Sequence, residues 1–316
     1  MRLVIAEKKS VATAIAQALC AAPVQKDGCY ECGQLLVTWA QGHLIDLAMP
    51  EDYKDRDWGK WSLDTLPVDP SGHWQWKIST ERGAGSRYRQ IVQLIRRADV
   101  DCLVNACDPD REGEAIFRRI ADMEGSRKPE LRLWVASLEA EAIQAAWRAM
   151  KPESEYRGLA WSAEIRSKAD WLTGMNASRA YSLLYNARFS VGRVQTPTLA
   201  MIAERDRQIR SHKPVPFWTV IADMGGWRLS SERIDSKDAA MLLRGQVERG
   251  RFRIMSVSRK RVNDRPPRLY DLTGLQKDMS RMYGMTAART LQALQHLYEL
   301  KLATYPRTDS RYITHD

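Results

Sequence analysis

Short apolar runs alternate with helical patterns in the N-terminal half of the chain. A run at residues 3–6 comes before a helical pattern at 10–19, and a run at 103–107 comes before a helical pattern at 114–123. An apolar run followed by a helix is the repeat of a parallel sheet whose faces are covered by helices. The pattern therefore predicts an α/β domain in which both runs are buried strands.

The second part of the chain begins with helix. Apolar residues at helical spacing predict a helical layer over residues 157–211, in which Thr196 and Pro197 form the cap and first turn of a helix. Pro214 and Pro216 end this layer, because proline cannot continue a helix. A domain boundary is therefore expected just before these two prolines.

Strands and two more helices are predicted in the remainder. Residues 217–221 open a strand-rich stretch that is expected to continue to about residue 262, apart from a helix near 236–247. Residues 272–282 and 286–299 predict two short helices joined at Gly284, a spacing found both in helix-turn-helix units and in ordinary helical structure. The whole pattern predicts four segments: residues 1–152, 153–213, 214–270 and 271–316.

The chain is basic. Its 316 residues include 49 Lys and Arg against 39 Asp and Glu, a net charge of +10, and the 28% charged and 44% hydrophobic content is typical of a globular protein. This excess, with 11 Trp, favours a nucleic acid as partner, because neutralised phosphates release counterions. Nine basic and two acidic residues lie in residues 244–270. That segment is either a solvated surface or a face that binds phosphates.

The cysteine content indicates a reducing compartment. Five Cys, an odd number, and an apolar N-terminal run far shorter than a signal peptide or a membrane span predict free thiols in a cytoplasmic protein. Cys29 and Cys32 form a CxxC pair, but a zinc site needs a second ligand pair at matching spacing, and the sequence shows none. Ordinary buried or edge thiols are therefore expected.

Carboxylates gather directly after the second predicted buried strand. Asp108, Asp110, Glu112 and Glu114 fall within seven residues, and Glu7 follows the first buried strand. The carboxyl ends of parallel strands meet at one edge of a sheet, where like charges need a cation, and hard oxygen ligands suit Mg²⁺. The sequence therefore predicts a magnesium site. The alternative is that Asp108 caps the next helix while Glu112 and Glu114 favour its N-terminal dipole.

A tyrosine with an arginine two residues later follows the last predicted helix. The phenol of Tyr305 can attack a phosphodiester and hold the strand as a covalent ester, provided that positive charge lies nearby. In an extended segment Arg307 lies on the same side, where its guanidinium can bridge phosphate oxygens. Lys8, next to Glu7, is a candidate donor to a phosphate oxygen or a leaving alkoxide. Taken alone, Tyr305 predicts a packed aromatic and Lys8 a solvated surface residue.

Together these motifs resemble the type IA DNA topoisomerases, most closely the bacterial topoisomerase III branch, over essentially the whole chain. The matching strings are VIAEKKS at residues 4–10, GHL at 42–44, DPDREGE at 108–114, ADWLTGMN at 169–176, SVGRVQTP at 190–197 and TYPRTDS at 304–310. The resemblance implies a Toprim domain with a Rossmann-like parallel sheet, then helical, β-rich basic and tyrosine-bearing helical domains in the four predicted segments. These would be parts of an incomplete type IA ring.

The resemblance also implies an isomerase that cleaves and rejoins one DNA strand without ATP, relaxing negative supercoils or decatenating DNA. Tyr305 would form a 5′-phosphotyrosine link, while Arg307 and Lys8 would steady the phosphate and the departing 3′-oxygen. Glu7 matches the acid near the scissile bond. The expected partner is DNA with single-stranded segments, in the cytoplasm of a bacterium and associated with its nucleoid or a plasmid.

Two further sets of residues are carried over by the resemblance. Mg²⁺, needed chiefly for religation, would be bound by Glu7, Asp108, Asp110 and Glu112. The DNA strand would be bound by Ser190, Val191, Gly192, Arg193, Val194 and Gln195. Arg193 and Gln195 are the strongest candidates for direct contacts. The complete enzyme is expected to be a monomer.

The chain departs from the family in length. It ends 11 residues after Tyr305, whereas the family's ring is completed by segments that return after the tyrosine motif. A missing C-terminal half is therefore expected, and exposed apolar faces would make the product marginally stable or prone to aggregation. Two alternatives stay open: another Toprim enzyme, such as a primase or nuclease, and an inactive DNA-binding fragment.

Overall fold

The structure is a computed structural model that describes residues 1–251, 253 and 255–313. It contains two compact units, which we name the sheet unit (Met1–Gln195 with Arg268–Asp316) and the hairpin unit (Thr196–Pro267). Across the described residues, none of the helices combines the length and the apolar character needed to cross a bilayer. These two units have different bounds from the four segments predicted from the sequence, which stay a prediction.

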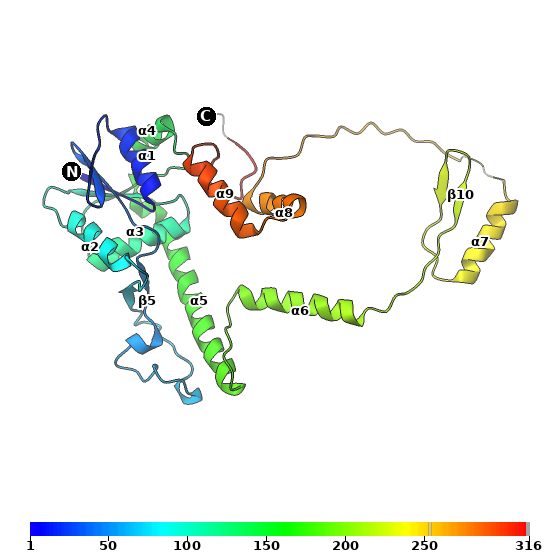
Figure 1. Cartoon of the computed structure of the whole chain (residues 1–316), viewed down its shortest axis with the longest axis horizontal. Helices are drawn as coiled ribbons and strands as arrows, with labels where there is room; N and C mark the ends of the chain where they lie inside the picture. Colours follow the sequence, from blue (N-terminus) through cyan, green and yellow to red (C-terminus); the bar gives the residue numbers. More distant parts are fainter. Residues whose placement is uncertain (252, 254, 314–316) are drawn as a thin grey trace. The chain divides into compact units, whose positions relative to one another are not determined.

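A mixed sheet forms the centre of the sheet unit (Figure 1). Within the described residues it has seven strands in the order β2-β3-β4-β1-β7-β8-β9. The strands are β1 (Arg2–Ala6), β2 (Val24–Lys26), β3 (Cys29–Cys32), β4 (Leu35–Trp39), β7 (Cys102–Ala106), β8 (Glu130–Arg132) and β9 (Lys151–Pro152). The four central strands, β4, β1, β7 and β8, are parallel, and the outer pairings are antiparallel. The predicted α/β class is confirmed, and the antiparallel edges are an addition.

Alternate residues of the central strands face two separate cores. Val4 and Val104 face the core under α1 (Lys9–Leu19) and α4 (Ala140–Arg148), whereas Leu3 and Leu103 face the core under α2 (Ala84–Ile95) and α3 (Arg111–Glu124). Successive side chains of a strand point to opposite faces, so a strand covered on both faces must be apolar throughout. This explains why both runs are apolar apart from Asn105, and it confirms both as buried strands.

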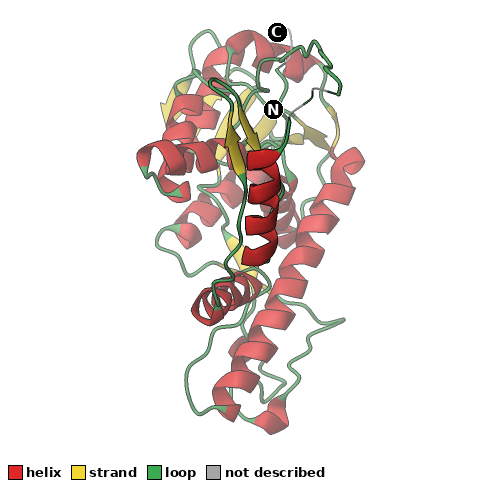
Figure 2. Ribbon diagram, turned by 90° about the vertical axis from the view of Figure 1, so that its right-hand side faces the viewer, coloured by secondary structure: helices red, strands yellow, loops and turns green. Residues whose placement is uncertain are grey.

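A long helix leaves the sheet and supports an excursion of the chain. Helix α5 (Arg157–Leu184) packs along α3 and extends away from the sheet, as Figures 1 and 2 show. We call the part of the chain from β5 (Ile45–Leu47) to β6 (Trp76–Ile78) the excursion. It also contains the short 3₁₀ turns η1 (Pro50–Asp52) and η2 (Leu63–Thr65). A third 3₁₀ turn, η3 (Glu153–Tyr156), leads into α5. The Asn176 side chain ties the excursion to α5, because it accepts from the Val68 amide at 2.6 Å and donates to the Val68 carbonyl at 2.9 Å.

The C-terminal helices carry Tyr305 onto the sheet. Helices α8 (Leu272–Tyr283) and α9 (Ala287–Glu299) are joined at Gly284, whose φ of 63° is left-handed and suits glycine. This confirms the predicted helix pair. After α9 the chain places Tyr305, which is only 7% exposed, in the same core as Val4 and α1, together with Tyr298. The tyrosine motif therefore belongs to the sheet unit.

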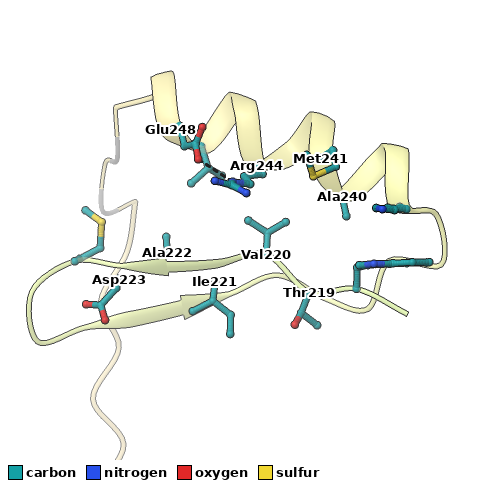
Figure 3. Close-up of a pocket in the computed structure, with 13 residues that line it drawn as sticks. Thr219, Val220, Ile221, Ala222, Asp223, Ala240, Met241, Arg244 and Glu248 are labelled. Atoms are coloured by element: carbon teal, nitrogen blue, oxygen red, sulfur yellow. Dashed lines mark hydrogen bonds and ion pairs between the residues drawn. The ribbon is translucent and has the colours of Figure 1, made fainter. Parts of the chain in front are cut away.

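The hairpin unit is small and open. It contains α6 (Gln195–Ser211) from Thr196 onward, the antiparallel pair β10 (Ile221–Asp223) and β11 (Arg228–Ser230), and α7 (Lys237–Arg249). Figure 3 shows Val220 and Ala222 turned toward Ala240 and Met241 of α7, across a groove of about 560 Å³, while Ile221 points away. Strand alternation produces this arrangement.

The hairpin unit confirms one prediction and corrects another. The predicted helix near residues 236–247 is α7. The prediction of strand continuing to about residue 262 is wrong for residues 251, 253 and 255–262, which carry no strand, while residues 252 and 254 lie outside the described part. A strand needs a partner edge for its hydrogen bonds, and the sequence pattern alone does not provide one.

Candidate active site

The acidic residues come together because β1 and β7 are neighbouring parallel strands. Ala6 and Ala106 are paired at the ends of these strands, so the residues that follow emerge at the same edge of the sheet. The Lys8 ammonium lies 3.5 Å from a carboxylate oxygen of Glu7 and 3.5 Å from one of Asp108. The predicted convergence of Glu7 with the acidic run is therefore present in the fold.

The turn between β7 and α3 is closed by Asp110 and Gly113. One carboxylate oxygen of Asp110, the N-cap residue, accepts a hydrogen bond from the Gly113 amide at 2.8 Å. A Cβ placed on Gly113 would lie 2.1 Å from the carbonyl oxygen of Asp108, so only glycine fits this turn. The capping alternative named Asp108 as the N-cap, but the N-cap is Asp110. The Asp108 side chain instead faces Lys8 and Tyr305.

Tyr305 lies against this turn although it is far away in sequence. Its phenol donates to Asp108 Oδ2 at 3.2 Å and to Asp110 Oδ2 at 3.0 Å, two alternatives for one proton. The Tyr298 ring packs edge-on against the Tyr305 ring, with 5.8 Å between centroids. Burial, and then the charges of Asp108 and Asp110, raise the pKa of the Tyr305 phenol above its ordinary value. The phenol is therefore neutral and beside two proton acceptors.

The same carboxylates also change the pKa of Glu7. Burial and the charge of Asp108 raise the pKa of Glu7 to about 7, although Lys8 and Arg307 oppose the shift. Arg307 is exposed and makes no hydrogen bond or ion pair within the described chain, but it is close enough to lower the pKa of Tyr305 as well. The predicted pair of Tyr305 and Arg307 thus combines a buried phenol with an available guanidinium.

Glu112 lies apart from the other predicted metal ligands. Its carboxylate is 3.2 Å from an Arg166 guanidinium nitrogen and 3.8 Å from His43 Nε2. Arg166 in turn lies 3.7 Å from Asp170, which also pairs with Arg193. The structure therefore gathers Glu7, Asp108 and Asp110 at Tyr305, and connects Glu112 to the segment predicted to bind DNA.

The chemistry of the donors at Tyr305 suits a hard divalent cation. The carboxylates of Asp108 and Asp110 lie close enough to share one phenol, and their charge raises the pKa of Glu7. Oxygen ligands with excess negative charge are those that Mg²⁺ takes. Over residues 1–251, 253 and 255–313, no group of three or more His, Cys, Asp or Glu side chains is arranged to hold a metal ion. The acids that fit are therefore the Asp108 and Asp110 pair, with Glu7 beside them.

A buried polar network beneath the turn was not anticipated from the sequence. Arg132, 1% exposed, forms an ion pair with Glu114 and donates to the Asp108 carbonyl at 2.8 Å. The Asn105 amide donates to Glu114 and to Glu153, each at 3.0 Å. Burial and the hydrogen bond with Glu114 raise the pKa of Glu153 to about 9. An arginine between two leucines, Leu131 and Leu133, was the available sequence signal.

The segment predicted to bind DNA follows the end of α5. Arg193 pairs with Asp170, with Nη2 at 3.4 Å from Oδ2, and the Gln195 amide donates to Ser190 Oγ at 2.9 Å. Of the six predicted residues, Ser190, Val194 and Gln195 are more exposed than Val191 and Gly192. The ion pairs through Asp170 and Arg166 connect Arg193 to Glu112 of the acidic run.

The sheet, the acidic turn and the position of Tyr305 define a Toprim domain joined to a tyrosine-bearing segment, and family comparisons agree. The Toprim domain model matches residues 2–138, and the DNA topoisomerase model matches residues 154–316, more than half of the chain. The chain therefore belongs to the DNA topoisomerase family, in the type IA class. Toprim domains in general bind Mg²⁺.

Individual relatives give the same assignment. The chain is 38% identical over 318 residues to a putative DNA topoisomerase 3 of Staphylococcus aureus strain bovine RF122 / ET3-1, and to DNA topoisomerase 3 of strain MRSA252. Each alignment covers 99% of this chain and 44% of the relative, so the chain spans less than half of their length. Full-length topoisomerase I from Thermotoga maritima has a similar fold, with a TM-score of 0.67 at 20% identity, over 99% of this chain and 50% of that one.

Proposed function

We propose that this chain carries the cleavage centre of a type IA DNA topoisomerase, and that the complete protein relaxes negative supercoils or decatenates DNA without ATP. The observation that carries the proposal is the hydrogen bonding of Tyr305 to Asp108 and Asp110, the second of which lies 195 residues away in sequence. A nucleophile placed against acids at the carboxyl edge of a parallel sheet suits strand cleavage better than a packing role.

In the proposed cleavage step the Tyr305 oxygen attacks a DNA phosphorus and the bond to the 3′-oxygen breaks. The phenol proton passes to Asp108 or Asp110, both within hydrogen-bond distance. Glu7, with a pKa of about 7, is protonated in a large fraction of molecules at neutral pH and gives a proton to the departing oxygen. Lys8 and Arg307 stabilise the phosphate charge. Religation runs in reverse and restores the phenol.

Asp108 and Asp110, with Glu7 beside them, would hold Mg²⁺. When bound, the ion would neutralise part of the carboxylate charge and add electrostatic stabilisation to the phosphate. Glu112 remains the fourth predicted ligand, although its carboxylate pairs with Arg166. Lys8 already supplies one positive charge to Glu7 and Asp108, and a second cation would relieve the repulsion that remains.

Residues 190–195 would bind the single strand that enters the site. Arg193 and Gln195 are the proposed contacts, since a guanidinium binds phosphate and an amide reads sugar or base groups. The ion pair of Arg193 with Asp170 is exposed, so a phosphate can replace the carboxylate at low cost. DNA as substrate, the missing C-terminal half, the monomeric state, and a cytoplasmic location beside the nucleoid or a plasmid stay predictions.

Capture of the covalent intermediate tests the proposal. The chain is incubated with a 3′-labelled single-stranded oligonucleotide, with Mg²⁺ or with EDTA, and is then denatured and separated by electrophoresis. We expect a labelled protein band that is abolished in Tyr305→Phe, because the phenylalanine ring lacks the nucleophilic oxygen. Binding of the uncleaved oligonucleotide, followed by fluorescence anisotropy, should change by less than about twofold, since one hydroxyl adds little to a phosphate-dominated interface.

Tyr298→Phe is the matched control. It removes a neighbouring phenol from the same core and should leave the adduct intact. An adduct that persists in Tyr305→Phe would assign the nucleophile elsewhere. Shortened oligonucleotide without any linked protein would instead indicate a nuclease of the Toprim type.

A further inference from the structure

One face of α5 carries residues four positions apart, and the segment that follows the helix lies on it. Asp170, Gly174, Ser178 and Ser182 share this face, because residues i and i+4 are neighbours on a helix. Residues 189–193 run back along it in the opposite direction, with Phe189 at Ser182, Val191 at Ser178 and Arg193 at Asp170. Each contact lies two residues further along the segment, and the helix partner moves by four positions from Ser182 to Ser178 and by eight from Ser178 to Asp170.

The two serines act as hydrogen-bond partners for the backbone of this segment. Ser182 Oγ accepts from the Phe189 amide at 2.9 Å and donates to the Phe189 carbonyl at 3.2 Å. Ser178 Oγ accepts from the Val191 amide at 2.9 Å and donates to the Val191 carbonyl at 3.3 Å. Each hydroxyl thus uses its donor and an acceptor on a single residue.

The spacing of the two pairs follows from the geometry of helix and extended chain. Four helical residues rise about 6 Å, and two extended residues span about 6.5 Å, so serines one turn apart match alternate residues of an extended segment. Ser167, on the same helix, behaves as mid-helix serines usually do, donating to the Ala163 carbonyl of its own helix at 2.9 Å. Ser178 and Ser182 use their hydroxyls on the segment instead.

Gly174 keeps the segment close to the helix. A Cβ on Gly174 would lie 3.6 Å from the Val191 carbonyl oxygen, an ordinary contact distance, so the segment backbone passes directly over this position. One turn earlier, Asp170 pairs with Arg193 and completes the series. The segment from Phe189 to Arg193 is therefore held at three points along α5, by backbone hydrogen bonds to Ser182 and Ser178 and by the side-chain ion pair with Asp170.

We infer that Ser178 and Ser182 are positioning residues for single-strand binding, and that they hold residues 189–193 in the conformation that presents Arg193 and Gln195 to the strand. The inference rests on the proposed function, which assigns residues 190–195 to DNA contact. A segment ordered before binding loses less conformational freedom when the strand arrives, so its contacts yield more affinity. The serines touch no DNA themselves and act through the backbone they hold.

The test compares Ser178→Ala/Ser182→Ala with Ser162→Ala, an exposed serine on the same helix, as matched control. In the double variant we expect faster hydrogen exchange at the Phe189 and Val191 amides, and single-strand affinity lower by roughly fivefold to thirtyfold, because four modest hydrogen bonds are lost. At saturating DNA the Tyr305 adduct should reach the parent level, which separates positioning from loss of fold. Ser162→Ala should match the parent in all three measurements.

Arg193→Ala distinguishes the inference from the proposed function. If Arg193→Ala weakens binding while the double serine variant retains parent affinity, the inference is overturned and the proposed function stands. If neither change affects affinity, residues 190–195 contact no strand and the inference is overturned with that assignment. The Tyr305-dependent adduct is measured separately and reports on the proposed function alone.

Discussion

Among individual residues, Tyr305 has more hydrogen-bond acceptors within reach than a buried tyrosine needs. A buried tyrosine needs one hydrogen-bond partner, and the Tyr305 phenol has two carboxylates within reach. Those acids and burial keep the phenol neutral, so it becomes a nucleophile only when a proton acceptor and positive charge act together. Asp108 and Asp110 provide the proton acceptor, and Lys8 and Arg307 provide the positive charge.

Glu153 gives a pH prediction that is independent of DNA. Its pKa of about 9 exceeds the ordinary glutamate value of 4.5, so the folded state binds a proton that the unfolded state releases. The stability from this proton is complete below pH 4.5 and is lost as the pH rises toward 9. Between pH 5 and pH 9 we expect the parent to lose at least about 1.4 kcal/mol of unfolding free energy from this group. Urea unfolding at several pH values measures it.

Glu153→Gln supplies the control for this prediction. The glutamine stays neutral at every pH, and it can still accept from Asn105 and donate to Glu114. Its unfolding free energy should therefore fall less between pH 5 and pH 9 than that of the parent. Equal pH dependence in the two proteins would show that Glu153 is ionised in the folded state.

At the scale of elements, the β7–α3 turn is the most constrained part of the site. It must deliver Asp108 and Asp110 to Tyr305, donate the Gly113 amide to Asp110, and leave the Asp108 carbonyl available to Arg132. These demands bring the backbone at Gly113 against the backbone at Asp108. The φ of Gly113 is not left-handed, so backbone conformation does not require a glycine here. The close approach of the two backbones does.

Gly113→Ala should therefore damage the site through the backbone. The added methyl would lie 2.1 Å from the Asp108 carbonyl oxygen. No rotamer change can relieve this clash, because the carbonyl belongs to the backbone and the methyl carbon is fixed to it. We expect a loss of about 3 kcal/mol or more in unfolding free energy and loss of the Tyr305 adduct. Chemical denaturation and adduct capture measure the two effects.

Gly158→Ala is the matched control for this change. It lies in α5 with nothing within 4 Å of the added Cβ, and alanine there should be neutral or stabilising by up to about 1 kcal/mol. An active, stable Gly113→Ala variant would mean that the turn has a second conformation compatible with Tyr305.

At the scale of the whole molecule, net charge links the chain to its expected partner. The net charge is +10, and many of the basic side chains form ion pairs within the fold, as Arg207 does with Glu204 and Arg210 with Asp206. Arg259, Lys260 and Arg261 are exposed and have no ion pair in the described part of the chain. Residues 244–270 were predicted to be either a solvated surface or a face that binds phosphates. Basic side chains without acidic partners favour the face that binds phosphates.

Salt dependence tests that reading. Replacing Arg259, Lys260 and Arg261 by Gln should lower the steepness of the log affinity against log salt plot by about 2, since each phosphate contact to a single strand contributes about 0.7. Titrations of a single-stranded oligonucleotide at several salt concentrations measure the slope.

The control changes net charge equally. Gln replacements at Arg207, Arg210 and Arg244, each paired with an acid in the parent, should alter the slope less. An identical effect of the two triple variants would mean that net charge, and not a local face, governs binding.

The sequence by itself determined much of the sheet unit. Apolar runs, broken only by Asn105, identified β1 and β7, because strands covered on both faces have no solvated side. Carboxylates directly after those strands located the acidic edge, and the order of short motifs identified the family. These are local properties, and a local pattern is sufficient to reveal them.

Only the tertiary structure decided which side chains meet. It paired Glu112 with Arg166, buried Arg132 and Glu153 beneath the turn, and brought Ser178 against Val191. Each of these contacts depends on how separate elements pack against one another, and composition and spacing do not specify that packing. The sequence therefore determined the elements and the kind of chemistry, and packing decided which side chains from different elements meet at the site.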